Sequence, residues 1–195
     1  MSKYNYFLSL ERLADAQLRA SRLLKSEFCG EVRKSLSDIS DINRQSNSLC
    51  SEVDAALFSE FLPPIDRVSI SACAHGLNRI TGAAFELAML TGCADRISRR
   101  SALCDEMSVC ASLAELIYEA VGYFEKLNSH SSLPDTYAFR LCLNKGRGVH
   151  SGFATRLSFS DVRSDQSPLI LGIEHYRRTE AEVYDTVIES ILENI

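Results

Sequence analysis

Three pairs of acidic residues stand four positions apart on stretches with helical periodicity. They are Glu11 with Asp15, Glu115 with Glu119, and Asp185 with Glu189. Residues at i and i+4 project from one face of a helix, so two such carboxylates can chelate a hard cation together. Isolated pairs of this kind are common on solvated helix faces, and we interpret all three as surface. Glu174 and Arg178 share the spacing with opposite charges, which predicts an ion pair on a helix surface.

The histidines and the glycine-rich stretch provide no catalytic motif. The four histidines are His75, His130, His150 and His175. They show no H-x-x-x-H spacing, so we interpret each as a surface or partly buried side chain rather than a ligand or base. The stretch 145–148 (Lys-Gly-Arg-Gly) lacks the Walker spacing and follows no predicted strand, so it is not read as a phosphate loop. The sequence therefore predicts no enzyme and no catalytic residue.

The chain has seven cysteines, an odd number, and no C-x-x-C motif. They are Cys29, Cys50, Cys73, Cys93, Cys104, Cys110 and Cys142. Cys50, Cys73 and Cys110 fall on or beside apolar helical stripes, where cysteine acts as a small hydrophobic residue. Without paired ligand spacing a zinc site is not expected. We predict that all seven are reduced thiols in a cytoplasmic protein.

Length and charge set outer limits. A chain of 195 residues allows one large domain or two very small ones. It has no run of 18 apolar residues and no signal-peptide pattern at its start, so we expect no membrane insertion and a cytoplasmic location. The net charge of −5 argues against nucleic acid as a partner. The arginines at 96–100 and 177–178 are read as solvated helix faces.

Apolar residues recur at spacings of three and four along most of the chain, which predicts amphipathic helices. The first stripe contains Leu10, Leu13, Ala14, Leu18, Ser21 and Leu24, and the second runs from Val32 through Leu36, Ile39, Ile42, Ser46, Leu49, Val53 and Ala56 to Phe61. The second implies a helix of roughly 30 residues. The third runs from Ile70 to Ala88, and the fourth from Leu103 to Leu127. Gly30 is expected in the break after the first helix.

The remainder of the chain predicts two more helices. The segment from Thr136 to about Phe159 is the weakest, because Gly146, Gly148 and Gly152 each lower helix propensity by about 1 kcal/mol relative to alanine. Loops are expected at 128–135 and 160–168, before a last helix that continues to the C-terminus. No alternating run indicates a strand. The sequence predicts an all-α protein of six long antiparallel helices.

The block from Leu57 to Ile70 joins the second and third helices through a rigid break. Pro63 and Pro64 should end the first of them, because proline fixes φ and has no N–H. Asp66 is expected to accept hydrogen bonds from the free N–H groups of the next helix as its N-cap. The block resembles the signature F-x-x-P-x-D-R-x-x-I of PhoU-like proteins, specifically the short PhoU-related family of phosphate transport regulators that accompany Pit-type transporters.

This resemblance covers nearly the whole chain, and its specific part is the first half. There the opening at 7–14 (Phe-Leu-Ser-Leu-Glu-Arg-Leu-Ala) also looks like the family, whereas the second half matches only in helix lengths and loops. The resemblance implies two tandem three-helix bundles within a single PhoU-like helical domain, 1–195. The first bundle would span residues 1–92 and the second 93–195.

PhoU proteins resembling this one bind metal clusters through E/D-x-x-x-D repeats, and here those carboxylates are replaced. The resemblance places the first pair at Asn43 and Asn47, and the next cluster at Asn78, Arg79 and Gly82. In the second half the matching positions fall near Leu143 and Arg147, and near His175 and Thr179. A cluster needs anionic ligands, so amides and an arginine should weaken binding strongly. We therefore expect no metal site and no cofactor.

The function implied by the resemblance is regulation rather than catalysis. We expect a PhoU-like regulator or accessory protein of inorganic phosphate transport that acts by protein–protein contact. Its partner would be a phosphate transporter or another membrane-transport protein, and the chain would form a homo-oligomer. The candidate partner or ligand face comprises Asn43, Asn47, Asn78 and Arg79. The alternative is a helical scaffold or dimerisation protein unrelated to phosphate; a metal-dependent enzyme is disfavoured by the missing ligands.

Overall fold

A computed structural model describes residues 4–30, 35–60, 63–93, 100–128 and 167–194, and every regular element within them is an α-helix. The helices are α1 (Tyr6–Cys29), α2 (Leu36–Ser59), α3 (Arg67–Cys93), α4 (Arg100–Asn128) and α6 (Ser167–Glu193). The all-α prediction is confirmed for this part of the chain. The helix predicted at 136–159, and with it the glycine-rich stretch 145–148, lies outside the described residues. None of the described helices has the length and apolar content needed to cross a membrane.

The ends of α1 are fixed by two local signals. The side chain of Asn5 accepts a hydrogen bond from the N–H of Leu8 over 3.1 Å and caps the first turn. At the other end Gly30 adopts φ 81°, a left-handed conformation that glycine tolerates without steric cost. The expected break at Gly30 is therefore confirmed.

Helix α2 is shorter than the roughly 30 residues expected from its stripe. It has 24 residues, which corresponds to a length of about 36 Å. At its start, the N–H of Ser35 donates to Glu27 Oε2 over 3.1 Å, which ties the chain to the end of α1 before the helix begins. At its end, Glu60 is already extended, with φ −95° and ψ 128°. The predicted helix therefore extends beyond the observed end of α2 at Ser59.

The junction between α2 and α3 is closed by Asp66 and Arg67. Asp66 Oδ2 accepts a hydrogen bond from the N–H of Ser69 over 2.9 Å, so the predicted N-cap is confirmed. The guanidinium of Arg67 donates back to the carbonyl oxygens of Leu57 and Glu60 at the end of α2. These contacts fix how the second helix leads into the third.

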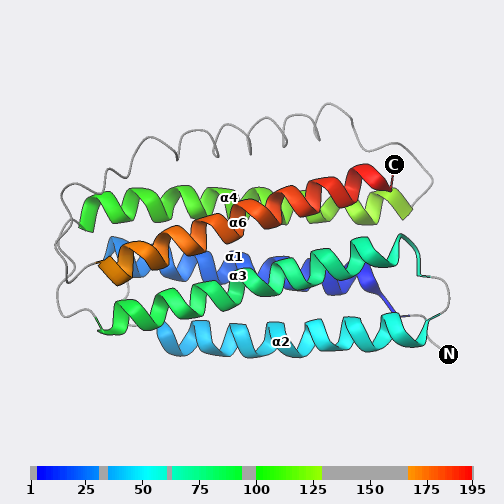
Figure 1. The fold of residues 1–195 in the computed structure, drawn as a ribbon, viewed down its shortest axis with the longest axis horizontal. Coiled ribbons are helices and arrows are strands. Elements are labelled where there is room, and N and C mark those ends of the chain that lie inside the picture. The colour runs from blue at the N-terminus through cyan, green and yellow to red at the C-terminus, as the bar shows by residue number, and fades with distance from the viewer. Residues whose placement is uncertain (1–3, 31–34, 61–62, 94–99, 129–166, 195) are drawn as a thin grey trace.

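The five helices lie along a common long axis (Figure 1). Helices α1, α4, α6 and α3 contact one another in a ring, and α2 packs from outside against α1 and α3. The predicted stripes form one continuous core across both halves of the chain, with fully buried side chains such as Leu13, Leu77, Phe124 and Tyr184 at its centre. Leu49 is only partly buried at its edge. Helix α1 packs most extensively against α4, and α3 packs most extensively against α6.

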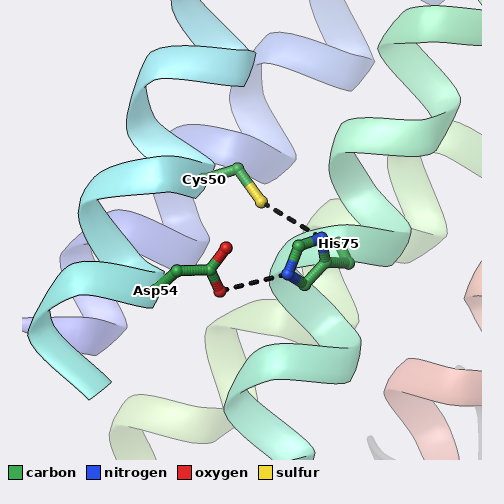
Figure 2. Close-up of side chains that lie close together, drawn as sticks. All are labelled: Cys50, Asp54 and His75. Atoms are coloured by element: carbon green, nitrogen blue, oxygen red, sulfur yellow. Dashed lines mark hydrogen bonds and ion pairs between the residues drawn. The ribbon is translucent and has the colours of Figure 1, made fainter. Parts of the chain in front are cut away.

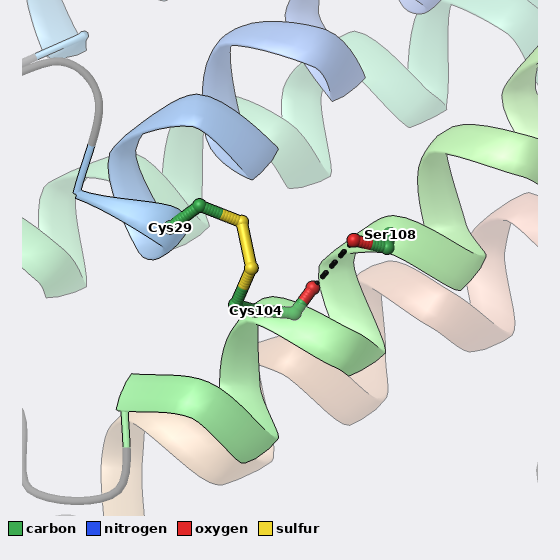
Figure 3. Close-up of a disulfide and its surroundings, with 3 residues drawn as sticks. All are labelled: Cys29, Cys104 and Ser108. Carbon is green, nitrogen blue, oxygen red and sulfur yellow. Dashed lines mark hydrogen bonds between the residues drawn. A yellow bond between two sulfur atoms is a disulfide. The ribbon is translucent and has the colours of Figure 1, made fainter.

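A disulfide between Cys29 and Cys104 joins the end of α1 to the first turns of α4 (Figure 3). The two helices run in opposite directions, so the end of one meets the start of the other, and the Cα atoms are 4.8 Å apart. The prediction of seven thiols is therefore wrong for this pair. It is confirmed for Cys50, Cys73 and Cys110, which are free and buried. Nothing is described of Cys142 or of the Cys93 side chain.

Helix α6 starts earlier than the sequence predicts. Ser167 and Pro168, which we expected in a loop, are its first two residues. Proline is well tolerated there, because the first turn of a helix has no internal partner for its N–H groups.

Candidate functional site

Three of the four predicted site residues meet along the seam between α2 and α3. The amide of Asn78 donates to Asn47 Oδ1 over 2.9 Å, and Ser46 Oγ donates to Asn78 Oδ1 over 2.8 Å. Further along, Thr81 Oγ1 donates to Asn43 Oδ1 over 3.3 Å. The seam is thus a ladder of neutral hydrogen bonds, in which Asn47 is exposed and its partner Asn78 is partly buried.

Arg79, the fourth predicted residue, is directed away from this ladder. Its guanidinium pairs with Glu182 of α6 at 3.7 Å, and both side chains are largely exposed. It therefore belongs to the α3/α6 surface rather than to the α2/α3 seam. The predicted face divides into an amide ladder and a separate ion pair.

These residues do not fit the multinuclear metal clusters of the PhoU-like family. The oxygens of the three asparagines accept hydrogen bonds from neighbouring side chains, and no carboxylate lies among them. In the second half, His175 lies near Glu86 at 3.9 Å, and Thr179 Oγ1 donates to the carbonyl of His175. The family positions at Leu143 and Arg147 lie outside the described residues. The amides of the ladder do not supply the anionic oxygens that such a cluster needs.

One turn beyond the ladder, the same seam brings together Cys50, Asp54 and His75 (Figure 2). Cys50 and Asp54 lie on one face of α2, and His75 faces them from α3. Cys50 Sγ lies 3.6 Å from His75 Nδ1, and Asp54 Oδ1 lies 3.1 Å from His75 Nε2. Burial, reinforced by the nearby Asp54 carboxylate, raises the pKa of the Cys50 thiol to about 11. The sequence analysis did not predict this group, because it considered each of the three residues separately.

A second polar group lies inside the core, between α1, α4 and α6. Its centre is Glu180, which is fully buried. Glu180 Oε1 accepts hydrogen bonds from Tyr176 OH over 2.7 Å and from Ser21 Oγ over 3.4 Å, while Oε2 has no partner among the described residues. Burial raises the pKa of Glu180 to about 8, although hydrogen bonds from Tyr176, Cys110 and Ser21 oppose that rise. The carboxyl is therefore mostly protonated at neutral pH.

The end of the bundle near the α2–α3 junction has several exposed apolar side chains. Phe58 is 92% exposed and Val68 is 73% exposed, and they flank the junction on either side. Leu8 and Leu192 are exposed at the same end, where α1 begins and α6 finishes. A pocket of about 420 Å³ opens here between the first turn of α1, Pro64 and the last turns of α4. Large contiguous patches of exposed apolar side chains are typical of interaction surfaces.

Three residues of the acidic pairs found in the sequence contact basic or aromatic side chains. Asp15 pairs with Arg19 at 3.8 Å and Glu115 with Arg22 at 3.0 Å. Glu11 accepts a hydrogen bond from the hydroxyl of Tyr118. The predicted pair of Glu174 and Arg178 is present at 3.7 Å. These contacts agree with the surface interpretation of Glu11, Asp15 and Glu115.

Neither a scan against protein-family models nor a search of curated proteins finds a match for this chain.

Proposed function

We propose that this chain is a PhoU-like regulator or accessory protein of inorganic phosphate transport. It acts by protein–protein contact on the cytoplasmic side of a phosphate transporter or another membrane-transport protein. It is not an enzyme, it forms a homo-oligomer, and it works without the multinuclear clusters of the family. Its six helices form two tandem three-helix bundles.

The first support comes from the residues that make up the family-like signature. Asp66 caps α3, Arg67 ties the junction back to α2, and Ile70 is fully buried in the core. Each of these positions therefore has a structural task at the α2–α3 junction. A signature whose residues build one turn is stronger support for the resemblance than a match of composition would be.

The observation that supports a partner most directly is the exposure of Phe58 and Val68. Burying such side chains against a partner gains about 25 cal/mol for each Å² of apolar surface removed from water. They flank the signature turn, so a partner that recognises this turn would cover both. The neutral ladder around Asn47 offers a second, polar contact on the same pair of helices.

Affinity purification of the tagged full chain from its own cells tests the proposal. We expect a phosphate transporter to co-purify with the unchanged protein and to be lost from the Phe58→Ser/Val68→Ser double variant. Leu171→Ser is the matched control, because Leu171 is an exposed apolar residue at the opposite end of the bundle. Asn47→Glu tests the amide ladder separately, and light scattering measures the oligomeric state.

The outcomes separate the proposal from its alternative. Loss of the transporter from the Phe58/Val68 variant, but not from Leu171→Ser, supports docking through the end of the bundle. Loss only from Asn47→Glu moves the docking face to the ladder. If no transport protein co-purifies with the unchanged chain, the phosphate-transport proposal is wrong. A helical scaffold or dimerisation protein unrelated to phosphate would then account better for the exposed residues.

A further inference from the structure

The α2/α3 seam holds three potential metal ligands of different chemistry within reach of one ion. One sulfur, one imidazole nitrogen and one carboxylate oxygen, from Cys50, His75 and Asp54, all lie within 4.8 Å of one another. Around a tetrahedral Zn²⁺, bond lengths of about 2.0–2.3 Å place neighbouring ligand atoms about 3.3–3.8 Å apart. The two short contacts are made by opposite nitrogens of His75, because Cys50 Sγ lies 3.6 Å from Nδ1 and Asp54 Oδ1 lies 3.1 Å from Nε2. One ion can bind only one of these nitrogens, so binding requires the exposed side chain of Asp54 or of His75 to turn towards it.

We infer that Cys50, Asp54 and His75 form a mononuclear site for Zn²⁺ or a neighbouring divalent transition metal. A thiolate, an imidazole and a carboxylate together favour Zn²⁺ and Co²⁺ over Mg²⁺ and Ca²⁺, which prefer oxygen ligands alone. The inference goes beyond the proposed function, and it does not depend on a transporter. It also departs from the sequence reading, which expected no metal.

The position of the site differs from that of the family's clusters. Cys50 and Asp54 each follow Asn43 and Asn47 by seven residues, which is about two helical turns, so they share the same face of α2. The family positions bear amides that bond to each other and to neighbouring hydroxyls. The new site thus lies further along the seam and uses a sulfur and an imidazole. Its residues are not those that the resemblance matches to the E/D-x-x-x-D repeats.

The exposure of the three residues leaves room for a fourth ligand. The side chains of His75 and Asp54 are 53% and 38% exposed, so the site opens to solvent on one side. Cys50 is only 3% exposed and lies at the base of the site. A water molecule can therefore complete a tetrahedral coordination from the open side.

The same three residue types can also form a catalytic group in which histidine and aspartate assist a nucleophilic thiol. A nucleophilic cysteine needs a thiolate, accessible to substrate and favoured by its surroundings. Cys50 is buried, and the carboxylate of Asp54 nearby disfavours a second negative charge. A bound cation reverses that preference, because it makes a thiolate favourable beside a carboxylate.

Titration of the reduced, purified full chain with Co²⁺ tests the inference, because a cobalt–thiolate bond gives a charge-transfer absorption in the near ultraviolet. We expect one Co²⁺ per chain, displaced by Zn²⁺. Cys50→Ser should abolish the absorption although Cys73 and Cys110 remain. His75→Gln and Asp54→Asn should each weaken binding by more than the 10–100-fold that loss of an outer-shell partner costs.

The control is His175→Gln, because His175 is a similarly exposed histidine beside a carboxylate, Glu86, on another surface. It should bind Co²⁺ like the unchanged protein. The His75 and Asp54 changes lie at the surface, so they test the site even if Cys50→Ser disturbs packing. The inference is wrong if the unchanged chain gives no thiolate absorption, or if the absorption survives in both Cys50→Ser and His75→Gln. Transporter capture is measured independently, so failure here leaves the proposed function standing.

Discussion

Asn78 of α3 donates its amide N–H to Asn47 Oδ1 of α2 over 2.9 Å. The resemblance to PhoU-like proteins places metal-binding carboxylates at both positions. Two carboxylates facing each other would repel unless a cation lay between them, whereas two amides attract each other directly. In this chain the connection between α2 and α3 is therefore made by neutral hydrogen bonds.

Restoring carboxylates should recreate metal affinity at the ladder. The change is Asn43→Glu, Asn47→Asp and Asn78→Asp at the ladder, together with Arg79→Asp, which removes the positive charge that follows Asn78 in the chain. Several changes are needed because one anionic residue would not offset the charge of a cluster. We expect the quadruple variant to bind Fe³⁺, Mn²⁺ or Zn²⁺ in addition to any ion held further along the seam. Elemental analysis after desalting measures this. More than about one tightly held metal per unchanged chain, lost on changing Asn43 or Asn47, would show that amides suffice.

Leu77 and Leu49 should differ in how much they stabilise the core. Leu77 is fully buried, so Leu77→Ala should cost ~2–5 kcal/mol of unfolding free energy. Leu49 is only partly buried, so Leu49→Ala should cost less, below about 2 kcal/mol. Urea denaturation measures both, with Leu192→Ala as the exposed control, expected to change stability by no more than about 0.5 kcal/mol. A loss under about 1 kcal/mol for Leu77 would contradict the packing.

The buried Glu180 should make the protein more stable as the pH falls from 8 towards 4.5. Its pKa in the folded chain is about 8, above the ordinary value of 4.5, so the folded state binds more protons than the unfolded state within this window. Stability is therefore lost as the pH rises through the window, by up to about 1.4 kcal/mol per pH unit. Cys110 and Tyr176, which contact Glu180, have pKa values raised well above 9 and 10 by burial.

Comparing Glu180→Gln with the unchanged protein isolates this effect. Urea unfolding at several pH values should show that the stability difference between the two proteins falls steadily between pH 4.5 and 8. Glu189→Gln is the control, because Glu189 is exposed on the same helix and its removal should leave the slope unchanged. Equal slopes for the unchanged protein and Glu180→Gln would mean that Glu180 is ionised in the fold.

Reducing the disulfide between Cys29 and Cys104 should lower stability by about 2–4 kcal/mol, because the bond closes a long loop in the unfolded chain. Thermal unfolding with and without dithiothreitol measures the change, and the double variant Cys29→Ser/Cys104→Ser should not respond to the reductant.

Alkylation and mass analysis of protein taken directly from cells tests the compartment in which the chain is located. A cytoplasmic protein should retain both thiols there, whereas a fully oxidised pair would contradict the proposed location.

Local signals predicted the described helices well, although α2 ends earlier and α6 begins earlier than expected. Gly30 and Asp66 act over one turn, and the stripe through Leu10, Leu13 and Leu24 reports directly which face is buried. The other failures concern contacts between distant segments. Nothing near Cys29 or Cys104 in the sequence says that the end of α1 meets the start of α4, because that follows from how whole helices pack.

The Cys50–His75 contact was within reach of the sequence. Asn47 lies three residues before Cys50, and Asn78 lies three residues after His75, which is the register of two antiparallel helices joined at the proline break. Extending the pairing by one turn would have brought the cysteine and histidine together. The burial of Glu180 could also have been predicted from the sequence, because it falls between Tyr176 and Tyr184 at the spacing of the buried stripe.

The disulfide has a mechanical consequence. The chain between Cys29 and Cys104, a separation of 75 residues, contains the whole of α2 and α3. When the two ends of the oxidised chain are pulled apart, the disulfide carries the force and this loop is not extended. The loop would add about 250–270 Å to the length of the stretched chain if the bond were absent. The first and last helices can be stretched, but the seam with Cys50, Asp54 and His75 is shielded from the load. Reduction of a single covalent bond would expose that seam to tension.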